Sequence, residues 1–369
     1  MGTTSGGPSR GDGRRTNGSG RRGRRAVFAG GAVIVLLAAL LTTGWATERW
    51  PFDEEDRYCW GAWQENSGPS FLSDARVAEG GARAATERGP TPGRPNGVCT
   101  LSIGSGGEED LRSEVTVTYG PAPEEAAPRW DWLLSHLGGS AVPLPDGLPG
   151  AVTGGSGLLV LPGRCDAPDG RPTAVTLTAE SSRSTGDGRR AASTGFGGAT
   201  STARLLVAAA NAAMERAGCG GPALRTDSPV LTLPEDPGPV ARSPLCRIPG
   251  LEVDEETAAL LAGYQVGTVG PDLQSCSVGY RRGAETHLSA LMVAEPRLVA
   301  LLDGAVGNRP PAKGWRATGS FTPAHRVLRT ECAGRPVAFV MSGMSEERAG
   351  AFADSVAARL GCPAVAPRT

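Results

Sequence analysis

The hydrophobic and polar positions separate one long apolar run from a longer region of short periodic segments. Ala26–Ala46 holds twenty-one residues without a charge. As a helix this run spans roughly 31 Å, the thickness of a hydrocarbon core. Seven arginines and one acid precede it, and several acids follow it, at Glu48, Asp53, Glu54, Glu55 and Asp56. The pattern predicts a single transmembrane helix in the cell membrane, with residues 1–25 in the cytoplasm and residues 47–369 extracytoplasmic.

Two other export signals stay open for this run. A cleaved signal peptide normally has a shorter apolar stretch, and Gly44–Ala46 is a poor cleavage site. Arg24 and Arg25 before an alanine-rich stretch also permit a twin-arginine signal. In each case the bulk of the chain is exported, so its eight cysteines are expected to form disulfides.

Beyond the run, the apolar spacing changes between the periods of strands and helices. Val115–Tyr119 alternates with period two, which is typical of a half-buried strand. Phe352, Val356 and Leu360 recur every four residues, as on the buried face of a helix that begins at Ser345. Strands are predicted near 98–103, 114–119, 157–161, 173–179, 276–280, 287–293, 316–321 and 337–342. Helices are predicted after Pro128, over 202–217, over 254–261 and from Ser345 onward.

The chain also contains an internal duplication. Its eight cysteines form two sets of four, and the sequences around them match in the same order at similar spacing. The corresponding segments are Pro128–Arg129 with Pro296–Arg297, 170–172 with 334–336 (both Gly-Arg-Pro), and Gly218–Cys219 with Gly361–Cys362. Chance does not readily produce several ordered matches, so we predict two related units.

These observations predict an α+β fold with two tandem related domains. Each is approximately ββαββα, an antiparallel sheet with helices on one face, behind the N-terminal transmembrane helix. The predicted segments are a disordered basic tail (1–25), the transmembrane helix (26–46), a stalk (47–57), a first repeat (58–221) with a flexible insertion (181–199), a Pro-rich linker (222–244), a second repeat (245–363) and a C-terminal tail (364–369).

The same layout suggests how the cysteines pair. If each closing helix packs back on its sheet, it runs antiparallel to the preceding strand, and the cysteines at their ends meet. This argument predicts Cys165–Cys219 and Cys332–Cys362, and by elimination Cys59–Cys99 and Cys246–Cys276. Four cysteines in a repeat allow three connectivities, so the other two remain open.

Motifs for catalysis are not found in the sequence. It has no G-x-S-x-G, H-E-x-x-H, Walker loop or CxxC, and Ser105 and Ser156 lie in glycine-rich turns. The histidines have no counterparts in the other repeat, which favours structural roles for His136, His287 and His325. We therefore expect no catalytic residue, no cofactor and no metal site.

Three further groups of residues have both a structural and a functional interpretation. The acidic clusters 108–110 and 254–256 lack the alternating spacing of a calcium loop, which favours solvated charge. The paired Gly-Arg-Pro segments mark either a shared binding edge or a repeated turn. Core packing is favoured over an exposed ligand platform for the tryptophans of the first repeat, Trp60, Trp63, Trp130 and Trp132.

Charge and composition limit the partners. Seven of the 37 basic and one of the 38 acidic side chains lie in the tail, so the remaining chain carries seven more acids than bases. This excess argues against nucleic acid as a partner. The Arg-rich tail, the single lysine Lys313, the Ala/Gly-rich span and the paired cysteines resemble uncharacterised single-pass membrane proteins of actinobacteria with a disulfide-bonded ectodomain. The resemblance rests on overall style and implies no site.

Taken together, the sequence favours a non-enzymatic, membrane-anchored extracytoplasmic binding or scaffold protein. Its partner outside the membrane would be a protein or a cell-envelope ligand. Two alternatives stay open: a cell-envelope hydrolase whose active site follows no motif, and an accessory subunit of a membrane protein complex.

Overall fold

The computed structural model describes residues 56–73, 82–104, 111–183, 197–231, 244–281 and 286–367. The predicted tail, transmembrane helix and most of the stalk lie outside these ranges, as do most of the insertion (181–199) and the middle of the linker. Among the described residues, no helix is long and apolar enough to cross a membrane. Asp56–Thr369 forms one compact unit, and its first two residues belong to the predicted stalk.

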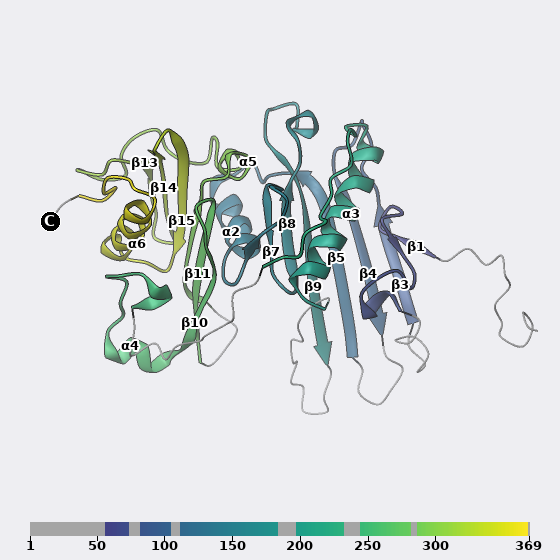
Figure 1. Cartoon of the computed structure of the whole chain (residues 1–369), viewed down its shortest axis with the longest axis horizontal. Helices are drawn as coiled ribbons and strands as arrows, with labels where there is room; N and C mark the ends of the chain where they lie inside the picture. The colour runs from purple at the N-terminus through teal and green to yellow at the C-terminus, as the bar shows by residue number, and fades with distance from the viewer. Residues whose placement is uncertain are drawn as a thin grey trace, which may run out of the picture. The chain divides into compact units, whose positions relative to one another are not determined.

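The first half is built on a seven-stranded antiparallel sheet with the strand order β3-β4-β5-β9-β8-β7-β6 (Figure 1). A two-stranded hairpin precedes it. The hairpin strands are β1 (Arg57–Tyr58) and β2 (Trp63–Gln64), followed by the 3-10 helix η1 (Ser70–Leu72). The sheet consists of β3 (Ala82–Arg88), β4 (Gly97–Gly104), β5 (Leu111–Pro121), β6 (Val142–Pro143), β7 (Gly150–Val152), β8 (Ser156–Val160) and β9 (Thr173–Arg183). The helices are α2 (Ala126–Leu137), η3 (Gly163–Cys165) and α3 (Ala199–Ala217).

The second half repeats this plan with a six-stranded antiparallel sheet in the order β10-β11-β12-β15-β14-β13. Its strands are β10 (Leu261–Val269), β11 (Leu273–Tyr280), β12 (Thr286–Val293), β13 (Thr318–Phe321), β14 (His325–Cys332) and β15 (Arg335–Ser342). Its helices are η4 (Leu245–Arg247), α4 (Glu255–Leu260), α5 (Pro296–Ala300) and α6 (Glu346–Arg359). Apart from the extra strand β6, both sheets have the same strand order. In each half one helix, α2 or α5, follows the third of these strands, and another, α3 or α6, follows the sixth.

Mixed α and β structure with antiparallel sheets is therefore confirmed, but the finer prediction ββαββα is wrong. Each main sheet has three strands before the helix that interrupts it, α2 or α5, and at least three strands after it. β3 was missed because its sequence, Ala-Arg-Ala-Ala-Thr-Glu-Arg, has no large apolar residue that alternates. β14 was missed because charged residues recur along it, at His325, Arg326, Arg329 and Glu331.

Helices cover both faces of each sheet, and not one face as predicted. α3 packs on the first sheet in one core, and α6 packs on the second sheet in another (Figure 1). The opposite faces of both sheets meet α2 and α5 in a third core that belongs to both halves. Successive strand residues divide between these cores: Leu159 belongs to the first core and Leu158 to the shared one.

Local sequence signals explain where the helices begin and end. Asp254 caps α4 by accepting a 2.7 Å hydrogen bond from the Thr257 amide, and Ser345 caps α6 by accepting from the Arg348 amide at 3.3 Å. α3 ends at Gly218, whose φ of 74° is left-handed and therefore suits glycine. α4 is shorter than predicted because Leu261 already begins β10.

Candidate functional site

Arg129 on α2 joins the two halves through backbone carbonyls. The residue is only 3% exposed. Within its own half it donates to the carbonyls of Pro123, at 2.5 Å, and Glu124, at 3.0 Å. In the other half it donates to the carbonyls of Leu301, at 3.2 Å, and Asp303, at 2.7 Å. Burial, and after it the charge of a neighbouring arginine, lowers the pKa of this guanidinium, although arginine stays protonated in proteins.

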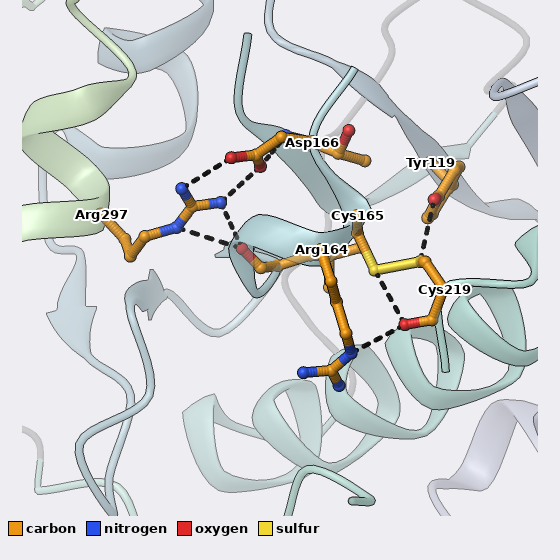
Figure 2. Close-up of a disulfide and its surroundings, with 8 residues drawn as sticks. Tyr119, Arg164, Cys165, Asp166, Cys219 and Arg297 are labelled. Atoms are coloured by element: carbon orange, nitrogen blue, oxygen red, sulfur yellow. Dashed lines mark hydrogen bonds and ion pairs between the residues drawn. A yellow bond between two sulfur atoms is a disulfide. The ribbon is translucent and has the colours of Figure 1, made fainter. Parts of the chain in front are cut away.

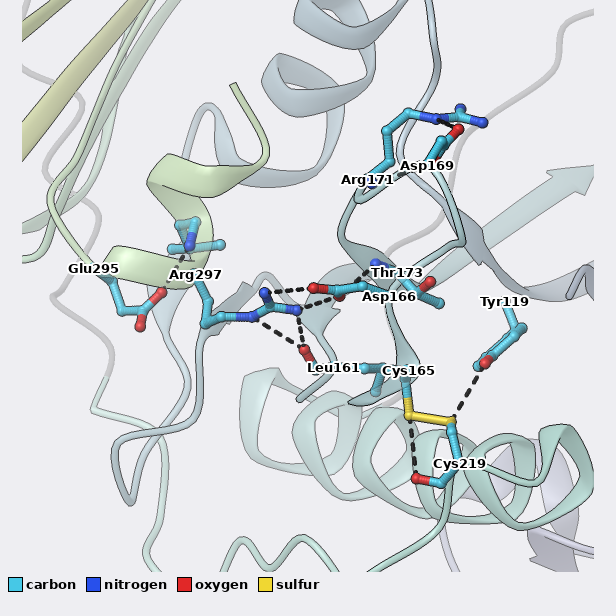
Figure 3. Close-up of polar contacts among 11 residues, drawn as sticks. Tyr119, Leu161, Cys165, Asp166, Asp169, Arg171, Thr173, Cys219, Glu295 and Arg297 are labelled. Carbon is cyan, nitrogen blue, oxygen red and sulfur yellow. Dashed lines mark hydrogen bonds and ion pairs between the residues drawn. A yellow bond between two sulfur atoms is a disulfide. The ribbon is translucent and has the colours of Figure 1, made fainter. Parts of the chain in front are cut away.

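Arg297 on α5 makes the corresponding contact in the opposite direction (Figure 3). Its guanidinium donates to both carboxylate oxygens of Asp166, at 2.9 and 2.5 Å, and to the Leu161 carbonyl at 2.5 and 3.2 Å. Asp166 also accepts from the Thr173 amide at 3.3 Å. Arg129 and Arg297 are the matched Pro-Arg positions of the duplication, so each repeat contributes one arginine that bridges to the other.

The Cys165–Cys219 disulfide lies directly beside this bridge, because Cys165 precedes Asp166 (Figure 2). It links η3 to the end of α3, and its Cα atoms are 5.2 Å apart. The Tyr119 hydroxyl donates to the Cys219 sulfur at 3.6 Å, and Arg164 donates to the Cys219 carbonyl at 2.9 Å. Burial raises the pKa of Tyr119, which keeps the hydroxyl protonated.

All eight cysteines are paired within their own halves. The Cα–Cα distances of the other three pairs are 5.2, 5.8 and 5.6 Å, within the usual range for disulfides. The four pairs agree with those expected from the sequence: Cys59–Cys99, Cys165–Cys219, Cys246–Cys276 and Cys332–Cys362.

The Gly-Arg-Pro segments have a repeated structural role. Arg171 donates to the Ala122 carbonyl at 2.8 Å, and Arg335 donates to the Ala294 carbonyl at 3.3 Å. Both carbonyls directly follow the third strand of the sheet in their own half. An aspartate accompanies each arginine, at Asp169 and Asp272. These contacts support a structural turn and not a shared binding edge.

The three histidines make separate contacts. His325 is buried, and its Nε2 lies 2.8 Å from the Asp131 carboxylate of the other half. The Nδ1 atom of His136 lies 2.8 Å from the Trp132 carbonyl, while that of His287 lies 2.8 Å from the Tyr280 hydroxyl. Within the described ranges, no three potential ligands among His, Cys, Asp and Glu are close enough to hold one metal ion.

Burial lowers the pKa of His136, and this predicts a stability that depends on pH. As the pH falls below about 6.5, the unfolded chain takes up a proton that the folded chain resists, so the free energy of unfolding decreases. His287 shifts in the same direction, mainly through burial and then through the charge of Arg348. We expect His136→Gln to reduce this loss, measured by chemical denaturation at about pH 7.5 and about pH 5.5. An unchanged pH slope in the variant would contradict the assignment.

The remaining candidates divide between cores, caps and undescribed segments. Trp60, Trp63 and Trp130 are at most 4% exposed, so these three belong to cores. The cluster 254–256 caps and begins α4. The cluster 108–110 and Ser105 lie outside the described residues. Ser156 begins β8, and its hydroxyl lies 3.0 Å from that of Thr153, within the turn before the strand.

A groove of about 530 Å³ opens between the segment before β13 and the end of β14. β13 pairs with β14 only as far as Thr318 opposite Arg329, so the last residues of β14 have no strand on this side. Trp315 is fixed beneath the groove by a 3.0 Å hydrogen bond from its ring nitrogen to Glu346. The lining includes Trp315, Arg316, Thr318, Arg329, Glu331 and Pro336.

No pattern in the sequence indicates this groove, because only the pairing of β13 with β14 brings its two sides together. Arg316 is exposed, and Arg329 forms an ion pair with Asp303. A second groove, of about 470 Å³, lies between the hairpin of the first half and α3, over Trp63, Leu72 and Leu205.

Comparison with known protein families, curated proteins and solved structures finds no match.

Proposed function

We propose that the protein is a non-enzymatic extracytoplasmic binding or scaffold protein, anchored to the cell membrane by Ala26–Ala46. The observation that carries this proposal is the junction between the halves. Arg129 and Arg297 bridge the halves in both directions, and a third core continues from one sheet to the other. Such a junction holds the surfaces of both halves in fixed positions, as a scaffold requires.

The groove beside β13 is the binding surface that we favour for the partner. The unpaired edge of β14 offers backbone hydrogen bonds to an extended segment, as in recognition by strand addition. Arg316 is exposed and provides a planar guanidinium donor, which suits a carboxylate, whereas Arg329 in the same lining already pairs with Asp303. We therefore infer a partner that presents an extended segment with an acidic side chain or a free carboxyl end.

This function is tested by site-specific photo-crosslinking of the full chain in its native membrane. A photoreactive residue replaces Thr330 in the groove, and the matched control replaces Leu260, which is 58% exposed on α4 and does not line the groove. We expect a discrete crosslinked partner from position 330 but not from position 260. The same adducts from both positions, or none, would contradict the binding surface.

The enzymatic alternative has its own readout. The purified full chain is incubated with peptide and cell-wall polymer substrates, and product formation is followed by mass spectrometry. We expect no turnover above that of the buffer. Turnover that disappears on a single substitution in the described residues would overturn the proposal of a non-enzymatic protein.

A further inference from the structure

Four strand edges end the two sheets, and three of them have features that hinder pairing with another chain. β6 has only two residues, one of which is Pro143. β10 is interrupted by register shifts between Leu261 and Gly263 and between Val266 and Val269. β13 has four residues, and its Gly319 amide donates to the Arg309 carbonyl at 2.8 Å. Short strands, prolines, bulges, coverage and charged side chains are the usual protections of a sheet edge.

The fourth edge, β3, has charged side chains at Arg83, Glu87 and Arg88, but in the described part of the chain it is neither short nor interrupted and contains no proline. All seven residues of β3 pair with β4 in one continuous register, and the strand contains no proline and no bulge. Its residues from Ala84 to Arg88 are exposed. A regular, exposed edge strand presents unpaired backbone donors and acceptors to a second strand.

The side chains of β3 are complementary to a second copy of the same strand. An antiparallel pair centred on Ala85 is the symmetric register that pairs all seven residues. In it, Ala84 lies opposite Thr86, and Arg83 lies opposite Glu87 of the other copy, on both sides of the axis. Opposite charges across antiparallel strands are favourable. A shift by one residue loses this pairing, because it places Arg83 opposite Arg88 in one direction and opposite Thr86 in the other.

The contacts of Arg83 and Glu87 keep this face in place. Arg83 forms an ion pair with Glu65 and donates to the Ser73 carbonyl at 3.0 Å. The Trp60 amide donates to the Glu87 carboxylate. The preceding hairpin thus holds both charged side chains in fixed positions on one face of β3. Because the Arg83 side chain is only 4% exposed, it would attract Glu87 of the other copy across the pair without a direct contact.

We propose that the protein forms a two-fold symmetric dimer in which β3 pairs with β3 of a second copy, centred on Ala85. Such an interface is isologous, so it closes after two copies and does not propagate. The proposal concerns the first half of the chain and is independent of the groove in the second half.

The test is disulfide trapping in the full chain, because all eight native cysteines are already paired. In the proposed register, the Cα atoms of two Ala85→Cys residues lie roughly 5 Å apart, within bridging distance. The matched control, Ala84→Cys, is also at an exposed position, but its two Cα atoms lie roughly 8 Å apart, too far for a disulfide. We expect on the order of ten-fold more reducible dimer from Ala85→Cys than from Ala84→Cys on a non-reducing gel.

Equal trapping at both positions, trapping at neither, or an adduct of a different mass would overturn the self-pairing. The last result would instead identify a different chain on this edge.

A second measurement tests the same dimer by changing the charge at its centre. Ala85→Lys and Ala85→Glu each place like charges opposite themselves, so each variant alone should be monomeric by light scattering, and an equal mixture should dimerise. Failure of the mixture to dimerise would also contradict the proposal.

Discussion

Replacing Arg129 with alanine should lower the free energy of unfolding by roughly 2–4 kcal/mol. The guanidinium is buried and donates to four carbonyls, two in each half. Its removal leaves a cavity and takes away the hydrogen-bond donors that now satisfy these carbonyls. Arg129→Lys should recover only part of the loss, because an ammonium has three donors and no planar fork.

Chemical denaturation of the purified full chain measures this effect. The control is Arg335→Ala, since Arg335 also contacts an aspartate and a carbonyl, but its side chain is 50% exposed. We expect the control to cost less than about 1 kcal/mol, as exposed ion pairs usually do. If the two alanine variants lose similar stability, Arg129 does not have the bridging role that we assign to it.

Removal of the Cys165–Cys219 disulfide by a double alanine substitution should cost about 4 kcal/mol in the chain-entropy model. The sequence separation of 54 residues is the longest of the four disulfides, so this one restricts the unfolded chain most. Denaturation of both proteins without reductant gives the difference. A loss below about 1 kcal/mol would mean that the unfolded chain keeps these residues close without the bond.

A double-mutant cycle tests whether this disulfide also positions the bridge between the halves. Cys165 adjoins Asp166, which accepts from Arg297. Combining the disulfide variant with Arg297→Ala should therefore give a coupling of about 0.5 kcal/mol or more. The matched cycle with Arg129→Ala should be closer to additive, because the hydrogen bonds of Arg129 go to Pro123, Glu124, Leu301 and Asp303 and not to the residues that contact the disulfide. Additivity in both cycles would show that the disulfide and the bridge are independent.

Local chemistry in the sequence was sufficient for part of this description. The matched cysteines and Pro-Arg positions indicated two related units, and both sheets have the same strand order. Ser345, Asp254 and Gly218 marked helix ends correctly, because caps depend on neighbouring backbone groups. The disulfide pairs also followed, since the direction of the closing helix relative to its sheet limits which cysteines meet.

Only the tertiary structure decided the contacts between the halves. Arg129 reaches Asp303, and Asp131 reaches His325, over separations of 174 and 194 residues, and no local pattern encodes either pair. The shared core was likewise hidden, because residues such as Leu158 and Leu159 look equally apolar although they face different cores. β3 escaped prediction for a related reason: pairing along β4 holds it in the sheet, and its own side chains carry little apolar signal. Sequence alone therefore determined the repeated unit and its covalent links, whereas packing determined how two such units become one body.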